Sequence, residues 1–145
     1  MSWPDPRPGL VIRYSYLWRR EALEGREEGV KDRPCAIVLA IKNDGEEATV
    51  YVLPITHVAP SRPEEAVELP GPTKARLGLD AERSWVVVTE GNSFVWPGPD
   101  LRFVQGEGAD SIAYGRLPPA VFSAVRARFL DFVRTRRSGI VKRTE

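Results

Sequence analysis

The chain has one cysteine, Cys35, and one histidine, His57, among its 145 residues. A single cysteine cannot form an internal disulfide, and neither a cysteine cluster nor a set of histidines is present to hold zinc. In the apolar run where it lies, we expect Cys35 to be a small buried side chain. The sequence also lacks a phosphate-binding loop, a dinucleotide-binding glycine motif and a His-Glu-x-x-His motif. We therefore expect neither a metal nor a cofactor.

Long hydrophobic runs are absent as well. No stretch of about 18 consecutive apolar residues occurs, so the sequence contains no candidate transmembrane helix. The first residues, Met1–Pro8, carry prolines and charges where a secretory signal would need an apolar segment. We therefore expect a protein of the cytoplasm that makes no membrane contact.

Charge is nearly balanced over the whole chain, with 21 lysines and arginines against 20 acidic residues. The balance hides a gradient, because residues 101–145 hold nine basic and four acidic side chains. A basic C-terminal third is compatible with an acidic partner such as nucleic acid, and equally with a solvated helix surface.

The clearest structural signal is a pair of apolar runs, Ala36–Ile41 and Val50–Ile55, separated by a polar turn that contains Asp44-Gly45. An Asp-Gly dipeptide between two such runs favours a β-hairpin. In an antiparallel pair, the start of the first strand lies beside the end of the second. We therefore expect Arg33 and Thr56 to lie close together at one edge of the sheet.

Only one long helix is expected. It begins at Pro118-Pro119 and ends before Gly139, because proline is tolerated in a first turn and glycine commonly follows a last turn. Residues at three- and four-residue spacing give it one apolar face: Phe122, Val125, Phe129 and Val133.

The other expected elements are short and joined by turns rich in glycine and proline. They are a strand over 9–17, a charged loop over 18–32 with a helical turn at 19–24, a short edge strand at 66–69, a compact turn at 77–80, a strand over 84–90, an aromatic segment at 94–96, a last strand at 101–104 and a connector at 112–115. This pattern predicts a mainly β fold, a small twisted barrel closed by the helix. We expect an extended tail over 1–8, a single domain over 9–137 and a tail over 138–145.

Three polar clusters at strand ends could carry chemistry. Arg33 could hold a phosphate in bidentate fashion, or could pair with Asp32 at the surface. Thr56 could donate to a phosphate oxygen and His57 could act as a base, although threonine also caps turns and a lone histidine is often only exposed. Glu90 could take a proton, and burial would raise its pKa, but it could also cap a turn or pair with an arginine.

Aromatic and polar residues beside these clusters could contact RNA. Most of the aromatic residues should pack in the core, but two tryptophans at loop borders could stack on unpaired bases. The expected RNA contacts are Trp18, Arg19, Asn92, Ser93 and Trp96.

The order of these features resembles the PemK/MazF-like toxin family. The shared motifs are Arg33-Pro34 at the start of an apolar strand, Pro54-Ile55-Thr56 at the end of the next, and a valine-rich strand that ends in the acid Glu90. The resemblance runs from about Gly9 to Phe132. Family members often have Asp-Gln where this chain has Glu90-Gly91, and a basic residue where it has Val88.

The resemblance implies an SH3-like barrel that forms a homodimer and acts as the toxin of a toxin–antitoxin pair. Such a toxin inhibits growth by cutting single-stranded RNA without a metal, and a cognate antitoxin protein binds it. The matching positions place Arg33, Thr56 and Glu90 in the active site, with His57 as another possible base. The alternatives are a CcdB-like barrel that binds a protein target such as a topoisomerase, and an RNA-binding barrel without catalysis.

Overall fold

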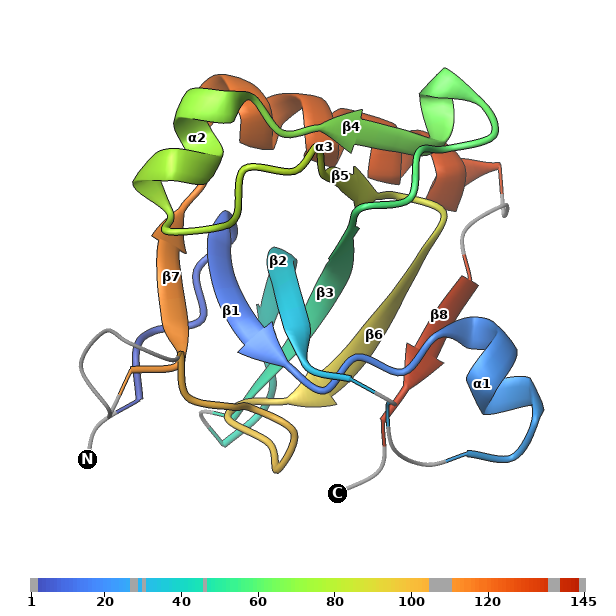
Figure 1. Cartoon of the computed structure of the whole chain (residues 1–145). Coiled ribbons are helices and arrows are strands. Elements are labelled where there is room, and N and C mark those ends of the chain that lie inside the picture. The colour runs from blue at the N-terminus through green and yellow to red at the C-terminus, as the bar shows by residue number, and fades with distance from the viewer. Residues whose placement is uncertain are drawn as a thin grey trace.

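The computed structural model describes residues 3–26, 29, 31–45, 47–104, 111–135 and 139–143. It has eight strands, three α-helices and one 3-10 helix (Figure 1). In chain order these are β1 (Leu10–Tyr14), α1 (Arg19–Leu23), β2 (Arg33–Lys42), β3 (Ala48–Thr56), η1 (Pro63–Glu65), β4 (Ala66–Glu68), α2 (Gly71–Arg76), β5 (Trp85–Val87), β6 (Glu90–Val95), β7 (Ala113–Arg116), α3 (Pro119–Arg134) and β8 (Gly139–Lys142).

The predicted hairpin is confirmed and forms the centre of the sheet. Strands β2 and β3 pair antiparallel from Lys42↔Ala48 at the turn to Cys35↔Pro54 at the far end. Gly45 in the turn has a φ of 87°, a left-handed conformation that glycine adopts without steric cost. Strand β1 pairs with the other edge of β2, so the three strands form an antiparallel core (Figure 1).

On the edge away from β2, strand β3 pairs with two different strands. The first half of β3 pairs with β6, and its end pairs with β5. Between Val87 and Glu90 the chain therefore leaves the end of β3 and begins to pair with its first half. The prediction of one continuous strand over 84–90 is therefore wrong. The valine-rich run suggested a single strand because composition does not reveal where a strand leaves one pairing and begins another. The short edge strand predicted at 66–69 is confirmed as β4, which pairs with β5.

The strands make a mainly β fold, as predicted, but the sheet does not close into a ring. Its hydrogen-bonded path runs β4-β5-β3-β2-β1-β7, and among the described residues no ladder joins β7 to β4. The predicted connector over 112–115 is instead strand β7, and the predicted strand over 101–104 contributes one bridge, Tyr14↔Leu101. Residues 139–142, where the sequence suggested a tail, form β8 and pair in parallel with β6.

Two apolar clusters fill the two sides of the central strands, because side chains alternate along a strand. On one side, Val11, Ala36 and Leu53 pack with residues of α3. On the other, Ile12, Ile37 and Val52 pack with aromatic residues of β1 and β6. Cys35 belongs to this second cluster and is fully buried, as predicted. Burial raises the pKa of its thiol well above the usual range.

Helix α3 lies across one side of the sheet together with α2, whereas α1 and β8 lie at the opposite end of the molecule (Figure 1). Val125 and Phe129 are buried in the first cluster, as the periodicity predicted. Val133, predicted on the same face, is 43% exposed, and Phe132 is buried in its place. Helix α2 was not predicted, because Pro70-Gly71-Pro72 suggested a stop, yet proline also fits the first turn of a helix.

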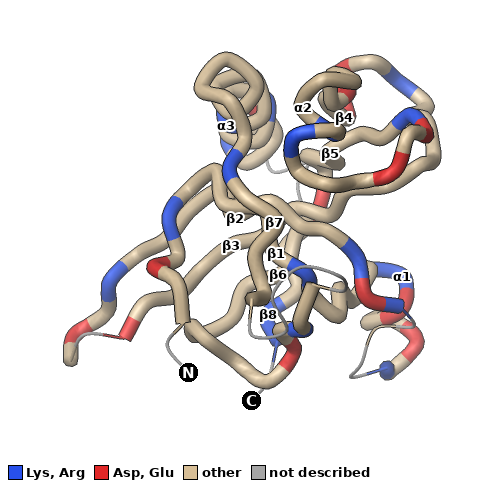
Figure 2. Tube along the Cα trace, turned by 60° about the vertical axis from the view of Figure 1, so that its left-hand side comes forward, with Lys and Arg blue, Asp and Glu red and all other residues tan. Residues whose placement is uncertain are grey.

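The charged residues of α3 are mostly basic, whereas α1 and the chain around α2, β4 and β5 carry both signs of charge more evenly (Figure 2). No helix within the described part of the chain is long and apolar enough to cross a membrane.

Candidate functional site

Arg33 and Thr56 line the same pocket, as the hairpin geometry predicted. The β2–β3 pairing ends at Cys35↔Pro54, and two further residues on each strand bring Arg33 and Thr56 opposite one another. The pocket has a volume of about 320 Å³. Its lining residues come from the start of α1, the start of β2, the end of β3 and the chain that follows it, η1, β4, and the end of β5 with the residues just after it. The lining residues are Trp18, Arg20, Arg33, Thr56, Val58, Ala59, Pro60, Ser61, Glu65, Ala66, Val87 and Thr89.

The guanidinium group of Arg33 has no counter-charge among the described residues. Its Nε is buried without a hydrogen-bond partner, and no described carboxylate lies within ion-pair distance of the group. Its guanidinium group lies over the Trp18 ring, whose centroid is 4.9 Å from Cζ. A buried donor without a partner is costly, by about 1–3 kcal/mol and more for a charged group. An anion in the pocket would remove that cost.

Polar groups that could assist Arg33 surround it. The Thr56 hydroxyl accepts a hydrogen bond from the Val58 backbone N–H at 3.2 Å, which leaves its own proton available to a ligand. Arg20 adds a second guanidinium, 5.5 Å from the Trp18 ring centroid. Glu65 is the only acid among the described lining residues, and one of its oxygens accepts from the Arg62 backbone N–H at 3.1 Å.

Trp18, which was predicted to contact RNA, has a structural contact that was not predicted. It lines the pocket, but guanidinium groups of Arg20 and Arg33 both lie against its ring. Cation–π contact of this kind stabilises a cation where no carboxylate is present. Trp18 therefore holds the two arginines in place, in addition to any contact that it makes with a ligand.

Glu90 does not line the pocket, although it follows the lining residue Thr89. Its carboxylate accepts a hydrogen bond from the Tyr16 hydroxyl at 3.1 Å and longer ones, at 3.4 Å, from the Arg19 backbone N–H. Burial raises the pKa of Glu90, as the sequence suggested, against the opposing effect of these hydrogen bonds. The carboxylate thus anchors the start of α1 to the start of β6.

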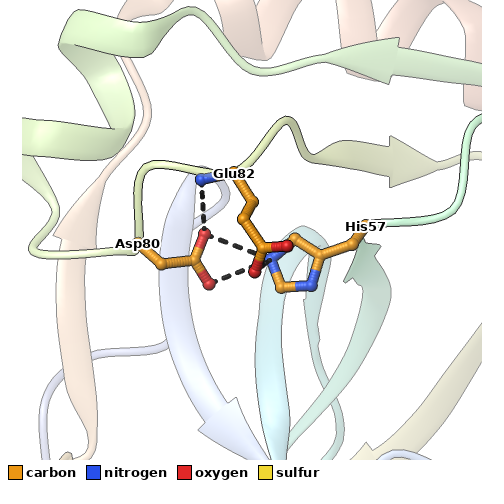
Figure 3. Close-up of side chains that lie close together, drawn as sticks. All are labelled: His57, Asp80 and Glu82. Atoms are coloured by element: carbon orange, nitrogen blue, oxygen red, sulfur yellow. Dashed lines mark hydrogen bonds and ion pairs between the residues drawn. The ribbon is translucent and has the colours of Figure 1, made fainter.

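His57 also lies outside the pocket. Its Nε2 is 2.9 Å from Asp80 Oδ2 and 3.9 Å from Glu82 Oε2, and both acids belong to the loop between α2 and β5 (Figure 3). His57 is the first residue after β3 and its ring contacts this loop, whereas Thr56, the last residue of β3, lines the pocket. The structure therefore separates the two members of the predicted Thr56-His57 cluster.

Asn92 and Ser93 are part of the interior. Asn92 is fully buried, and its side-chain amide bonds both the N–H and the C=O of Leu17, at 2.9 and 2.8 Å. Its Oδ1 also accepts from Arg143 at 3.1 Å. Ser93 is buried, and its backbone carbonyl accepts from the Arg143 N–H. These positions tie β6, β8 and the strand-to-helix connection together, so the described contacts of both side chains are structural.

The two remaining predicted contacts lie apart from each other. Arg19 is exposed at the start of α1, beside Glu90, and is not a lining residue of the pocket. Trp96 lies at the far end of β6, stacked on Phe94 with a centroid distance of 6.2 Å. It lines a different cavity, formed with the N-terminal residues Trp3–Arg7. Of the five predicted RNA contacts, only Trp18 therefore lines the Arg33 pocket.

Arg20 and Glu65 line the pocket, and the sequence analysis did not single them out. Arg20 could have been found from its position two residues after Trp18 in the expected helical turn. Glu65 comes from a proline-rich segment with no regular pattern, and nothing in its spacing connects it to Arg33.

No known protein-family model matches this chain, and no curated protein matches it.

Proposed function

We propose that this chain is the toxin of a toxin–antitoxin pair, a metal-independent endoribonuclease on an SH3-like barrel of the PemK/MazF-like kind. The observation that supports the proposal is the uncompensated Arg33 guanidinium in the pocket that also holds Thr56. A phosphodiester carries the negative charge that would balance the Arg33 cation, and arginine binds phosphate oxygens in a planar, bidentate geometry.

The reaction would be attack of a ribose 2′-hydroxyl on the adjacent phosphorus. The 2′-oxygen–phosphorus bond forms while the bond to the 5′-oxygen breaks, which gives a cyclic phosphate and a 5′-hydroxyl end. Arg33 and the Thr56 hydroxyl would stabilise the extra charge on the phosphoryl oxygens. Glu65, as the acid that lines the pocket, would take the 2′-hydroxyl proton, and water would protonate the leaving oxygen.

The chain's partners follow from the same proposal. We propose single-stranded RNA as the substrate, encountered in the cytoplasm, and a cognate antitoxin that brings an acidic segment to the basic C-terminal third. We also propose a homodimer, because β4 and β7 end the path of the open sheet and an edge strand can pair with a second copy.

A second candidate is a barrel that binds single-stranded RNA without cutting it. The observation that favours it is that neither predicted base lines the pocket. The Glu90 carboxylate accepts hydrogen bonds from Tyr16 and Arg19, and His57 contacts Asp80. If Glu65 does not act as a base, the pocket retains its phosphate-binding groups and has no described proton acceptor with the right chemistry.

The test is incubation of the purified chain with a mixed-sequence single-stranded RNA in excess EDTA, with the product ends resolved. We expect discrete cuts with cyclic phosphate ends for the wild type. Arg33→Ala should reduce cleavage by about a hundredfold to a thousandfold. Glu65→Gln should slow cleavage by at least about a hundredfold with RNA binding retained.

Arg83→Ala is the matched control. Arg83 also lies against a tryptophan ring, 5.0 Å from the Trp85 centroid, but its guanidinium is neutralised by Glu68 at 2.8 and 2.9 Å. This variant should cut like the wild type. Absence of cuts by the wild type across several RNAs, together with Arg33-dependent binding, would favour the second candidate.

A further inference from the structure

The only histidine of the chain, His57, follows the last residue of β3 and lies beside two carboxylates, outside the Arg33 pocket. We propose that His57, Asp80 and Glu82 form a binding site for a divalent transition-metal ion, with zinc the best match. Their ligand atoms, one imidazole nitrogen and a carboxylate oxygen from each acid, all lie within 4.8 Å of one another (Figure 3). The inference is independent of the proposed RNA chemistry.

The distances are those of a site that needs small side-chain rotations to close on an ion. Zinc lies about 2.0–2.2 Å from nitrogen and oxygen ligands, so two ligand atoms in a tetrahedral site are about 3.4 Å apart. The observed separations from His57 Nε2 are 2.9 Å to Asp80 Oδ2 and 3.9 Å to Glu82 Oε2. These values lie on either side of the tetrahedral spacing.

The two acids have different surroundings. Asp80 Oδ1 accepts hydrogen bonds from Lys74 Nζ at 2.7 Å and from the Glu82 backbone N–H at 3.1 Å. These bonds fix the carboxylate and leave Oδ2 at 2.9 Å from His57 Nε2, where it can bind an ion. Hydrogen bonds of this kind commonly orient metal-binding carboxylates.

Charge around the imidazole favours a cation. Lys74 neutralises one carboxylate, and its side chain is 5% exposed, so it is a fixed part of the fold. Among the described residues, the only charged partner of the Glu82 carboxylate is His57, at 3.9 Å. With neutral histidine, Asp80, Glu82 and Lys74 together leave one uncompensated negative charge beside Nε2.

The ligand set points to the class of ion. Imidazole nitrogen suits zinc and its neighbours among the transition metals, whereas magnesium and calcium prefer oxygen ligands alone. The three side chains are exposed, which leaves room for water as a fourth ligand. A bound ion would join the end of β3 to the α2–β5 loop. The chain just after His57, from Val58 to Ser61, forms a wall of the Arg33 pocket, so the ion would also brace that wall.

The site can be tested by calorimetric titration of the full chain, without a histidine tag, with zinc chloride at neutral pH. We expect one zinc ion per chain. Because the chain has one histidine, its imidazole proton resonances report directly on the site, and they should shift with saturation at one equivalent.

Two ligand variants and one control complete the experiment. Glu82→Gln should weaken zinc binding by at least about tenfold, and His57→Ala should remove the one-to-one binding. Neither change touches Lys74, so the circular dichroism spectrum should match the wild type. Glu47→Gln, an exposed acid in the β2–β3 turn, should bind zinc as the wild type does. An unshifted imidazole resonance, or binding that survives His57→Ala, would overturn the proposal.

Discussion

Arg143 and Arg33 both lie against aromatic rings, and their surroundings are opposite. Arg143 is 5.4 Å from the Tyr14 centroid, and its side chain is 2% exposed. It pairs with Asp100 at 3.2 Å and donates to the Ser15 carbonyl at 2.7 Å and to Asn92 at 3.1 Å. Arg33 has a similar ring contact, with Trp18, but neither a carboxylate nor a hydrogen bond for its Nε within the described structure.

The difference separates a structural arginine from one that is ready to bind a ligand. The fold supplies counter-charge and hydrogen-bond acceptors to Arg143, because an unpaired buried charge would destabilise it. Arg33 is held at the edge of a pocket with its charge uncompensated. The same side chain can therefore hold the fold together or bind an anion, according to the partners around it.

The largest effect on folding is expected at Arg143. Arg143→Ala leaves Asp100 without its cation in a site where that carboxylate is 14% exposed. Removing one partner of a buried pair costs about 3–5 kcal/mol, so the free energy of unfolding should fall by that amount. Urea unfolding followed by tryptophan fluorescence measures it. A change below about 1 kcal/mol would show that Arg143 is not the structural arginine that its contacts indicate.

At Arg33 the expected effects are reversed. Arg33→Ala should reduce RNA cleavage by about a hundredfold to a thousandfold, as the loss of a preorganised donor to a transition-state oxyanion does. Its free energy of unfolding should equal or exceed that of the wild type, because the substitution removes a buried unpaired donor and breaks no described hydrogen bond. A strongly destabilised variant with cleavage in proportion to its folded fraction would contradict the assignment.

Asn92 is a neutral side chain that, like Arg143, makes buried structural hydrogen bonds and can be compared with Arg33 in the same way. Asn92→Ala removes both amide bonds to Leu17 and one acceptor of Arg143, and leaves buried backbone groups unpaired. We expect a loss of about 2 kcal/mol of stability in urea unfolding. RNA affinity of the folded variant should equal that of the wild type, and a selective loss of affinity would restore Asn92 as an RNA contact.

Glu90 should have the smallest effect, and its sign depends on pH. Its folded-state pKa is raised by burial above the value of about 4.3 in an unfolded chain. The protonated carboxyl therefore favours the fold, and this contribution is present below about pH 4.3 and lost as pH rises through the folded pKa. Glu90→Gln should stabilise the protein at pH 7 by less than about 1 kcal/mol, allowing for solvent screening, and should match the wild type near pH 4.

Thermal unfolding of both proteins across this pH range measures the Glu90 effect. A loss of cleavage in Glu90→Gln with RNA binding intact would instead return Glu90 to the catalytic set.

Sequence reasoning was most successful where local pattern decides structure. The Asp44-Gly45 turn between two apolar runs was enough to predict the hairpin, and antiparallel pairing then brought Arg33 near Thr56. The apolar period of α3 likewise predicted Val125 and Phe129 in the core. These features depend on residues close in sequence, so their physical causes can be read along the chain.

Features that depend on long-range pairing were missed. Whether residues 139–142 form a strand depends on the edge of β6, nearly fifty residues earlier, and not on their own composition. The pocket acid Glu65 belongs to η1, and the two acids beside His57 belong to the loop between α2 and β5. The pairing of β3 with β5 brings the first acid to the Arg33 pocket and the other two to His57, and no spacing in the sequence predicts that pairing.

Affinity for single-stranded RNA tests the central claim most directly, measured by fluorescence anisotropy for the wild type, Arg33→Ala and Arg83→Ala over a range of salt concentrations. We expect Arg33→Ala to weaken binding at least about tenfold and to lower the slope of log affinity against log salt by about 0.7, the share of one phosphate contact. Arg83→Ala, whose guanidinium Glu68 already neutralises, should bind like the wild type. Equal affinities for all three proteins would contradict the assignment of Arg33 as the phosphate-binding arginine.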